Sequence, residues 1–216
     1  MSDIIIWGVP GSPFTRAVMA GLEEKRASYR FHPMAPQESK SESYLKMNPF
    51  GRVPTLEHGD FVLYETQAIL RYLDQLHPEP ALTPAAPRAA ARMNQIIGIN
   101  DWYFFPKAAA PIVFQRIVGP TLLGLPTDEA VVASGVPMAR TCVTELERLL
   151  GDNQFLAGDT LSIADLILAP QFDLFDMTPE GAGLLRGTRL HAWLTRMRER
   201  PSMVATRPPA SLKGAA

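Results

Sequence analysis

The sequence predicts an α/β domain followed by an all-helical domain. A strand–helix–strand pattern and then a strand–strand–helix pattern occupy the first third of the chain. A proline-rich stretch follows, and beyond it the apolar residues recur only at helical spacing. Strands grouped before helices are typical of two separately packed units. We therefore expect a first domain at residues 1–79, a linker at residues 80–87 and a helical domain at residues 88–216.

The first domain opens with a β–α–β pattern. Residues 4–7 form a continuous run of β-branched and aromatic side chains, which is typical of a buried strand, and turn-forming residues at 8–13 end it. Residues 17–22 carry apolar side chains at helical spacing, and residues 29–32 alternate like a second strand. A unit of this kind has a right-handed crossover and predicts a pair of parallel strands.

The second half of this domain reads as a hairpin and a helix. Residues 53–57 and 61–64 are two β-rich runs joined by Gly59-Asp60, which is the turn signal of an antiparallel hairpin. Thr66 is suited to cap the helix that follows, and residues 68–76 carry an apolar stripe. The complete order, βαβ and then ββα, is that of a thioredoxin-like domain.

The helical domain contains one strong local signal at residues 161–166. Ser162 as N-cap and Asp165 three residues later can satisfy each other's free amides, while Leu161 and Leu166 occupy the positions of a hydrophobic staple. We therefore assign Asp165 a structural role. The helix that it opens is apolar enough to form the centre of the domain. Cys142 lies among leucines at helical spacing and is also expected to be structural.

Composition and charge exclude several classes of function. The chain has 21 basic and 22 acidic residues, so it lacks the broad positive field that binding to nucleic acid requires. No stretch of about 18 uncharged apolar residues occurs, and a membrane span is not expected. A single cysteine, Cys142, permits neither an internal disulfide nor a zinc site, so we expect no metal. Asp3 stands where a signal peptide carries basic charge, which favours a cytoplasmic location.

Four motifs in one order and spacing carry a family resemblance. They are Gly11-Ser12-Pro13-Phe14-Thr15-Arg16-Ala17-Val18, residues 48–56, Glu65-Thr66 with the helix after it, and residues 155–159 leading into 161–165. On these motifs the chain resembles the cytosolic glutathione transferase superfamily, and in particular its serine-type classes, similar to phi and theta. The resemblance implies a homodimeric detoxification enzyme that transfers alkyl or aryl groups to glutathione. Glutathione is then a cosubstrate, and no cofactor is needed.

A serine at the junction of a loop and a helix suits the chemistry of this family. The thiol of glutathione, with a pKa of about 8.5, is mostly protonated at neutral pH, so the reaction needs a group that stabilises the thiolate. A hydroxyl that donates to sulfur and the amino terminus of a helix both do so. The resemblance assigns this role to Ser12, with Thr15 as the alternative hydroxyl. Judged by position alone, Ser12 is also an ordinary N-cap.

The resemblance further implies which residues bind glutathione. Sequence alone predicts a trans Val53-Pro54 bond, whereas in this family the proline is cis and the residue before it pairs with the cysteinyl unit through its backbone. Glu65 is expected to bind the γ-glutamyl ammonium, and Thr66 the adjacent carboxylate. Lys40 and Arg52 are the candidates for the glycyl carboxylate.

An aromatic pocket is expected for the second substrate, a small hydrophobic electrophile. Phe14, Trp102, Tyr103 and Phe105 are its predicted lining. Successive residues of the run 102–105 point different ways round a helix, so about two of the four are expected to face a pocket. Asp101 is a candidate for contact with the γ-glutamyl ammonium across a dimer interface.

Four other functions fit the same motifs. A glutathione-dependent dehalogenase, isomerase or peroxidase would keep the site and differ mainly in the aromatic pocket. A non-catalytic binding protein would keep only the fold. Ser12, Pro54, Glu65 and Thr66 together argue against that last possibility, because a pure scaffold has no need of a complete tripeptide site.

Overall fold

A four-stranded mixed sheet forms the first part of the protein, which is described here from a computed structural model covering residues 3–208. The strands are β1 (Ile4–Gly8), β2 (Tyr29–Pro33), β3 (Thr55–His58) and β4 (Phe61–Tyr64), in the spatial order β2-β1-β3-β4. β1 pairs with β2 in parallel, with Ile4 opposite Tyr29, and β3 is antiparallel to both β1 and β4. The predicted parallel pair and the hairpin are confirmed.

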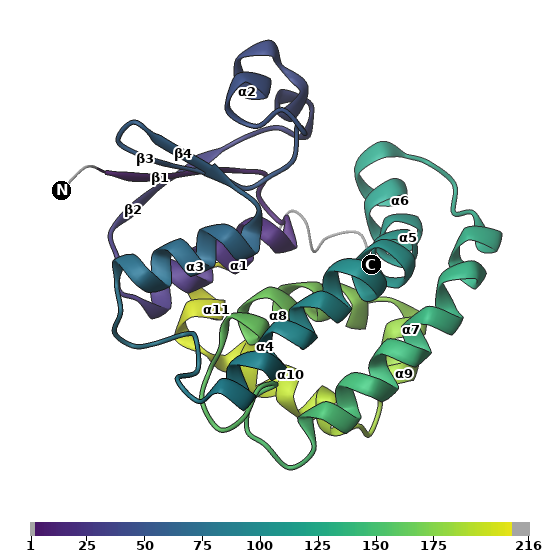
Figure 1. The fold of residues 1–216 in the computed structure, drawn as a ribbon. Helices are drawn as coiled ribbons and strands as arrows, with labels where there is room; N and C mark the ends of the chain where they lie inside the picture. The colour runs from purple at the N-terminus through teal and green to yellow at the C-terminus, as the bar shows by residue number, and fades with distance from the viewer. Residues whose placement is uncertain (1–2, 209–216) are drawn as a thin grey trace.

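Helices α1 (Pro13–Glu24) and α3 (Thr66–Leu76) cover the face of the sheet that is turned toward the helical domain (Figure 1). A short 3₁₀ helix, η1 (Pro36–Lys40), and helix α2 (Glu42–Met47) lie on the other side. α1 packs closely against α3 at Gly21, where an added Cβ would lie 2.4 Å from Leu70 Cδ2. The sheet with these helices has the predicted thioredoxin-like architecture, which we call the sheet domain.

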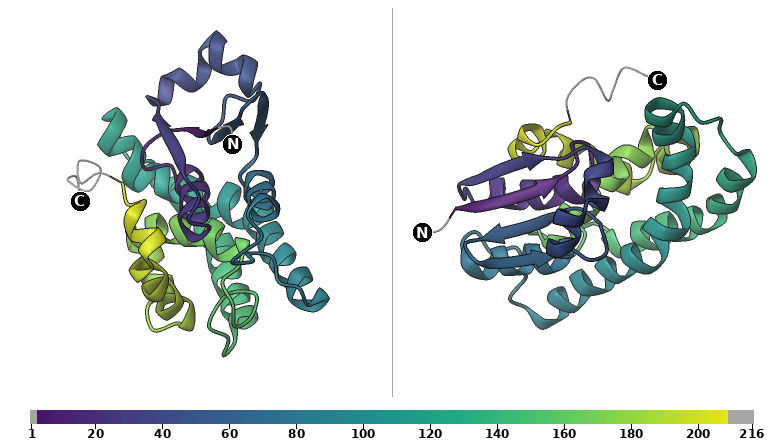
Figure 2. Two further views of the ribbon diagram at one scale, coloured as in Figure 1. Left: turned by 90° about the vertical axis from the view of Figure 1, so that its left-hand side faces the viewer. Right: turned by 90° about the horizontal axis from the view of Figure 1, so that it is seen from above.

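The helical domain follows an irregular segment at residues 77–86. Its first helices form one long run: α4 (Pro87–Ile99), the π-helical η2 (Asn100–Ala109), α5 (Ala110–Val113), the π-helical η3 (Phe114–Val118) and α6 (Gly119–Leu123). α7 (Glu129–Leu150), α8 (Ile163–Asp176), α9 (Pro179–Leu185), α10 (Arg189–Glu199) and α11 (Pro201–Ala205) complete it (Figure 2). The end of the predicted domain, residues 209–216, lies outside the described residues.

α8 is the central helix of this domain, and it packs against α1 of the sheet domain. Eleven of its 14 residues are buried, so it is apolar on nearly every side. One continuous core therefore runs from Ile6 in the sheet through Leu70 to Phe172 on α8. Cys142 is buried in the same core, and burial raises its pKa to about 11. Its structural assignment is thereby supported.

Asp165 holds the start of α8 in place, as the capping pattern predicts. It is fully buried, and its carboxylate accepts hydrogen bonds from the amides of Leu156 (2.9 Å) and Ser162 (2.9 Å) and from the Ser162 hydroxyl (2.8 Å). A fourth donor, Trp193 Nε1 on α10, lies 2.9 Å away and was not foreseen from the sequence. Burial raises the pKa of Asp165, although all four donors favour the carboxylate.

We expect Asp165→Ala to lower the free energy of unfolding by roughly 3 to 5 kcal/mol, because it leaves several buried donors without an acceptor. Urea unfolding followed by tryptophan fluorescence measures this change. Asp159→Ala is the matched control, since Asp159 is exposed at the other end of the same loop and should change stability by less than about 0.5 kcal/mol. Equal unfolding midpoints for the two variants would contradict the structural role of Asp165.

Candidate functional site

A cleft of about 1210 Å³ lies between the sheet domain and the helical domain. Its walls differ in chemistry. The side formed mainly by the sheet domain is polar and includes Ser12, Asn48, Arg52, Val53, Pro54, Glu65, Thr66, Gln67 and, from η2, Asp101. The side formed by the helical domain and by Phe14 is mainly apolar and includes Phe105, Ala109, Val113, Ile117, Val118, Ile167, Pro170 and Leu174. A cleft of this kind can hold a polar molecule beside an apolar one.

Ser12 lies in this cleft at the amino terminus of α1. The loop after β1 turns at Gly11, whose φ of 86° is in the left-handed region that favours glycine. Ser12 is the N-cap, and its Oγ accepts a hydrogen bond from the Thr15 amide at 3.4 Å. Pro13 has the φ that the first helical position requires. Among the described residues the Ser12 hydroxyl hydrogen has no acceptor, so it can be donated to a ligand.

Thr15, the alternative hydroxyl, does not line the cleft. It is only 2% exposed, and its side chain lies against Gly8 of β1, where an added Cβ would be 2.5 Å from Thr15 Oγ1. That hydroxyl has no hydrogen-bond partner among the described residues. The geometry therefore favours Ser12 over Thr15, because the side chain three residues into the helix is turned toward the sheet.

Val53 and Pro54 line the cleft, and the bond between them is cis, as the resemblance implies. Two buried polar side chains support this loop. The Tyr44 hydroxyl lies 2.7 Å from the Arg52 carbonyl and Asn48 Nδ2 lies 2.9 Å from it, and both donate to that oxygen. These supports were not predicted, because nothing in the local sequence shows that Tyr44 on α2 faces the loop.

Glu65 and Thr66 begin α3 at the edge of the cleft. Glu65 is exposed and has a φ of 72°, which is rare for a residue other than glycine. Strained backbone of this kind clusters at functional sites. Its side chain makes no capping hydrogen bond. Next along the helix, Gln67 donates to Asp101 at 2.8 Å within the same chain, which brings Asp101 to this end of the cleft. Three of these four side chains are carboxylates or amides that can bind an ammonium.

The two candidates for the glycyl carboxylate occupy different places. Arg52 lines the cleft. Lys40 ends η1 outside the lining, and its Nζ lies 2.8 Å from the position that a Cβ on Gly51 would occupy. The structure thus favours Arg52, because it lines the cleft and directly precedes Val53 and Pro54, which also line it.

Only part of the predicted aromatic pocket is found. Phe14 and Phe105 line the cleft and pack edge to face, with ring centroids 4.6 Å apart. Trp102 and Tyr103 are 73% and 46% exposed and do not line it, which corrects their assignment. Phe104 is in the core, stacked on Phe172. Only one of the four neighbouring aromatics faces the cleft, because the rotation between successive helical residues turns the others away.

The apolar side of the cleft comes mainly from residues that sequence reasoning did not select. They lie at helical spacing after Phe105, at Ala109, Val113 and Ile117, and on α8. The spacing was visible in the sequence, but it did not show that this face borders a cleft rather than the core. Gln171 on α8 also lines the cleft, and its buried Oε1 has no hydrogen-bond partner among the described residues.

An ion pair among residues that line the cleft joins the two domains. Arg16 on α1 is 6% exposed, and its Nη1 lies 2.5 Å from Asp173 Oδ2 on α8. Arg198 Nε on α10 lies 2.7 Å from the other oxygen of Asp173. Burial by itself raises the pKa of Asp173, but hydrogen bonds from Arg16 and Arg198 outweigh it and hold the pKa below its ordinary value.

Across residues 3–208, no group of three or more histidine, cysteine, aspartate or glutamate side chains is arranged to hold a metal ion. Nor does any helix of that range combine the length and the apolar character needed to cross a bilayer.

The fold and the cleft define a two-domain protein built to hold a polar and an apolar ligand together, and comparison with known proteins identifies its family. Residues 7–81 match the family model for the glutathione S-transferase N-terminal domain, and residues 129–196 match that for the C-terminal domain. The chain therefore belongs to the cytosolic glutathione transferase superfamily, and it is similar to the phi class, as the motifs predict.

Plant proteins are among its relatives. The chain is 33% identical to "Probable glutathione S-transferase GSTF2" of Oryza sativa subsp. japonica, over 87% of each chain. It is 30% identical to "Glutathione S-transferase F7" of Arabidopsis thaliana, over 94% of this chain and 98% of that one. The structure of glutathione transferase F7 from Populus trichocarpa superimposes with a TM-score of 0.85 at 28% identity, covering 94% of this chain and 97% of that one. Glutathione S-transferase I from mais, in complex with an atrazine glutathione conjugate, has a TM-score of 0.84 at 30% identity over the full length of both chains.

The Asp173 ion pair predicts a pH dependence of stability. Because the folded pKa is lowered, the folded state binds fewer protons, and the contribution of Asp173 is complete above its unfolded pKa of about 3.9 and is lost as the pH falls below it. The difference in unfolding free energy between wild type and Asp173→Asn should therefore be constant from about pH 7 to 5 and shrink below about pH 4. Urea unfolding at each pH measures it, with Asp159→Asn as the exposed control. A difference that persists unchanged to pH 3 would contradict the ion pair.

Proposed function

We propose that this protein is a glutathione transferase that activates the thiol of glutathione as a thiolate for attack on a hydrophobic electrophile. The observation that carries the proposal is the position of Ser12, at a helix amino terminus and between the polar and apolar sides of one cleft. Family membership and relatives named as glutathione S-transferases support it. Glutathione is consumed in the reaction and is therefore a substrate rather than a resident cofactor.

The polar side of the cleft offers a partner for each charged group of glutathione. The carboxylate of Glu65 would bind the γ-glutamyl ammonium, with Asp101 as a second acidic group of the same cleft. Thr66, in the first turn of α3, would offer its hydroxyl and a free amide to the γ-glutamyl carboxylate. The backbone of Val53 would pair with the cysteinyl unit, and Arg52 would bind the glycyl carboxylate.

In this arrangement the sulfur atom lies beside Ser12. The hydroxyl donates a hydrogen bond to the sulfur, and the amino terminus of α1 adds its positive dipole, so both lower the pKa of the thiol. The thiol proton passes to solvent. The thiolate then forms a carbon–sulfur bond with an electrophile held against Phe14 and Phe105, and the leaving group departs with its electron pair. Ser12 keeps its own proton throughout, because it stabilises the anion rather than acting as a base.

Ser12→Ala tests both the activity and the role of the hydroxyl. Wild-type protein should form conjugates when glutathione and an aryl halide are supplied together. In the variant, loss of one hydrogen bond to an anion should raise the pKa of the bound thiol by about one to two units and leave glutathione affinity nearly unchanged. Thiolate absorbance against pH in the glutathione complex measures the shift.

Thr15→Val is the matched control, since it removes a hydroxyl of the same helix turn but keeps the side-chain volume. It should leave the thiol pKa unchanged. A shift in Thr15→Val alone would move the catalytic role to Thr15. If neither variant shifts the pKa, the helix amides stabilise the thiolate and Ser12 is only a cap.

We also propose that the protein is a homodimer. Large apolar side chains are exposed on and beside β4, at Phe50, Phe61 and Val62, and on η2, at Trp102 and Tyr103. Exposed apolar groups in such number are typical of an interface with another chain. On α3, Tyr72 packs near Phe61, with ring centroids 5.3 Å apart, and belongs to the same surface. A second copy that covers this surface would explain why the large apolar side chains of Trp102 and Tyr103 are exposed although they do not line the cleft.

Light scattering at micromolar concentration should therefore give twice the chain mass of 23.8 kDa. Trp102→Asp places a charge in the proposed interface and should shift the protein toward the monomer, because burying an unpaired charge is costly. Leu123→Asp is the control, since Leu123 is 53% exposed on α6 and should leave the mass unchanged. A wild-type particle of 23.8 kDa would contradict the dimer.

A further inference from the structure

One wall of the apolar side of the cleft is a single face of the helical run α5–η3–α6. The residues of this face occur in pairs four positions apart, so that each turn of the run presents two side chains to the cleft. They are Val113, Phe114, Ile117, Val118, Thr121 and Leu122. Gln115 and Arg116, between the first two pairs, do not line the cleft and lie on the opposite side of the run.

The core supports this wall only in part at its centre, where Ile117 and Val118 are partly buried against it. None of the five residues of η3 is buried, and its π-helical hydrogen bonds are interrupted on either side by Pro111 and Pro120, which lack backbone donors. A helical segment whose apolar side chains are only partly buried gains less hydrophobic free energy from the core than a fully buried one does. The contacts of its outer side therefore contribute to fixing its place.

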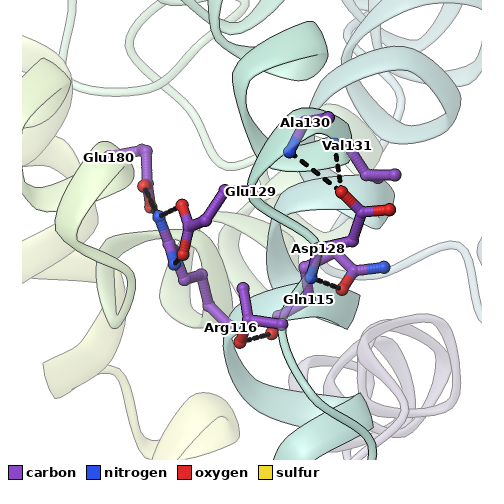
Figure 3. A network of polar contacts seen from close by, with 8 residues as sticks. Gln115, Arg116, Asp128, Glu129, Ala130, Val131 and Glu180 are labelled. Atoms are coloured by element: carbon purple, nitrogen blue, oxygen red, sulfur yellow. Dashed lines mark hydrogen bonds and ion pairs between the residues drawn. The ribbon is translucent and has the colours of Figure 1, made fainter.

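Those contacts are a cluster of ion pairs and hydrogen bonds centred on Arg116 (Figure 3). Arg116 Nη1 and Nη2 donate to the two oxygens of Glu129, at 2.6 and 2.9 Å, at the start of α7. Nε and Nη2 also donate to Glu180 on α9, at 3.1 and 2.5 Å. A planar guanidinium can bind two carboxylates in this way, whereas a lysine ammonium cannot match the geometry.

The neighbouring residue adds a second attachment. Gln115 Oε1 accepts from the Asp128 amide at 2.8 Å, and the Gln115 carbonyl accepts from the Thr127 hydroxyl at 2.9 Å. Asp128 is itself the N-cap of α7 and accepts from the amides of Ala130 and Val131 (Figure 3). η3 is thus joined to the first turn of a 22-residue helix whose inner face is part of the core.

The two carboxylate partners of Arg116 differ in environment. The Glu180 side chain is 16% exposed and that of Glu129 is 70% exposed, while Arg116 is 22% exposed. Solvent screens the Glu129 pair more strongly, so Glu180 is the stronger partner. The hydrogen bond from Arg116 holds the pKa of Glu180 below its ordinary value, so this pair remains charged at neutral pH.

We infer that Arg116 is a positioning residue for the second substrate: its pairs with Glu180 and Glu129 set the place of the apolar wall and thereby the choice of electrophile. The inference rests on the proposed transferase function. The groups that would bind glutathione lie on the loop before α1, on the loop before β3, at the start of α3 and, for Asp101, on η2, and none belongs to η3. Loss of the Arg116 pairs should therefore change the apolar site and leave the glutathione site unaltered.

The test compares Arg116→Met with wild type. Calorimetry gives the affinities for S-hexylglutathione and for glutathione, and their ratio reports on the apolar site without turnover. We expect the ratio to fall roughly three- to tenfold in Arg116→Met, with the affinity for glutathione unchanged. In steady-state kinetics, KM for a bulky apolar electrophile should rise by a similar factor while KM for glutathione stays the same. Arg116→Lys should restore only part of the ratio.

One control and one further pair of variants separate positioning from general stability. Arg148→Met removes an exposed pair with Glu145 on α7, 2.7 Å long and remote in sequence from the cleft lining, and should leave the ratio unchanged. Glu180→Gln keeps Arg116 and the Glu129 pair, so it serves if Arg116→Met does not fold, and it should lower the ratio more than Glu129→Gln does.

An unchanged affinity ratio in folded Arg116→Met or Glu180→Gln overturns the inference, whether both affinities stay the same or both fall by the same factor. Wild-type protein that binds both ligands but forms no conjugate with any electrophile would instead overturn the proposed function. The affinity ratio would still decide the role of Arg116, because it requires no chemistry.

Discussion

The packing of α1 against α8 is the contact on which the rest of the site depends. Ser12 is the N-cap of α1, and α8 provides part of the apolar side of the cleft. In the proposed reaction, the separation of these two helices would set the distance between the thiol and the second substrate. Apolar burial brings the two helices together, and the Arg16–Asp173 pair fixes how they lie. Asp165 in turn fixes where α8 begins. A shift of this helix pair would separate the two sides of the cleft and disable a reaction that needs both substrates within bonding distance.

The two sides of the cleft divide the chemistry between the domains. The sheet domain supplies most of the polar groups from loops and helix starts, where backbone amides are unpaired and hydroxyls can be donated. The helical domain supplies an apolar surface from the sides of helices, where side chains can change without loss of backbone hydrogen bonds. In the proposed reaction, glutathione, which is the same in every turnover, would bind to a site built on backbone geometry. The electrophile, which can differ, would bind to a site built on side chains. The ion pairs of Arg116 fit this division, because they hold the apolar wall of the electrophile site from outside the cleft.

Much of the fold followed from the sequence because its signals are local. The strand–helix–strand order, the Gly59-Asp60 hairpin and the Ser162–Asp165 capping pattern each depend on residues a few positions apart, and all are found in the structure. The N-cap position of Ser12 was also predicted this way, because an N-cap between a turn and Pro13 has a local signature, whereas its role toward sulfur came from family resemblance and stays a prediction. The cis state of Val53-Pro54 came from family resemblance, since the bond itself favours trans.

By itself the sequence determined the order of the elements, the caps of α1 and α8 and the loop that presents Ser12, since neighbouring residues and backbone geometry decide these. The cap of α3 was not among them, because Glu65 and not Thr66 is its N-cap. Only the tertiary structure decided that Thr15 faces the sheet, that Phe105 and not Trp102 or Tyr103 lines the cleft, and that Arg116 meets Glu180, 64 positions along the chain. Each of these outcomes depends on the rotation of one helix relative to another. That rotation is set by the packing of side chains distant in sequence, and no short segment contains it.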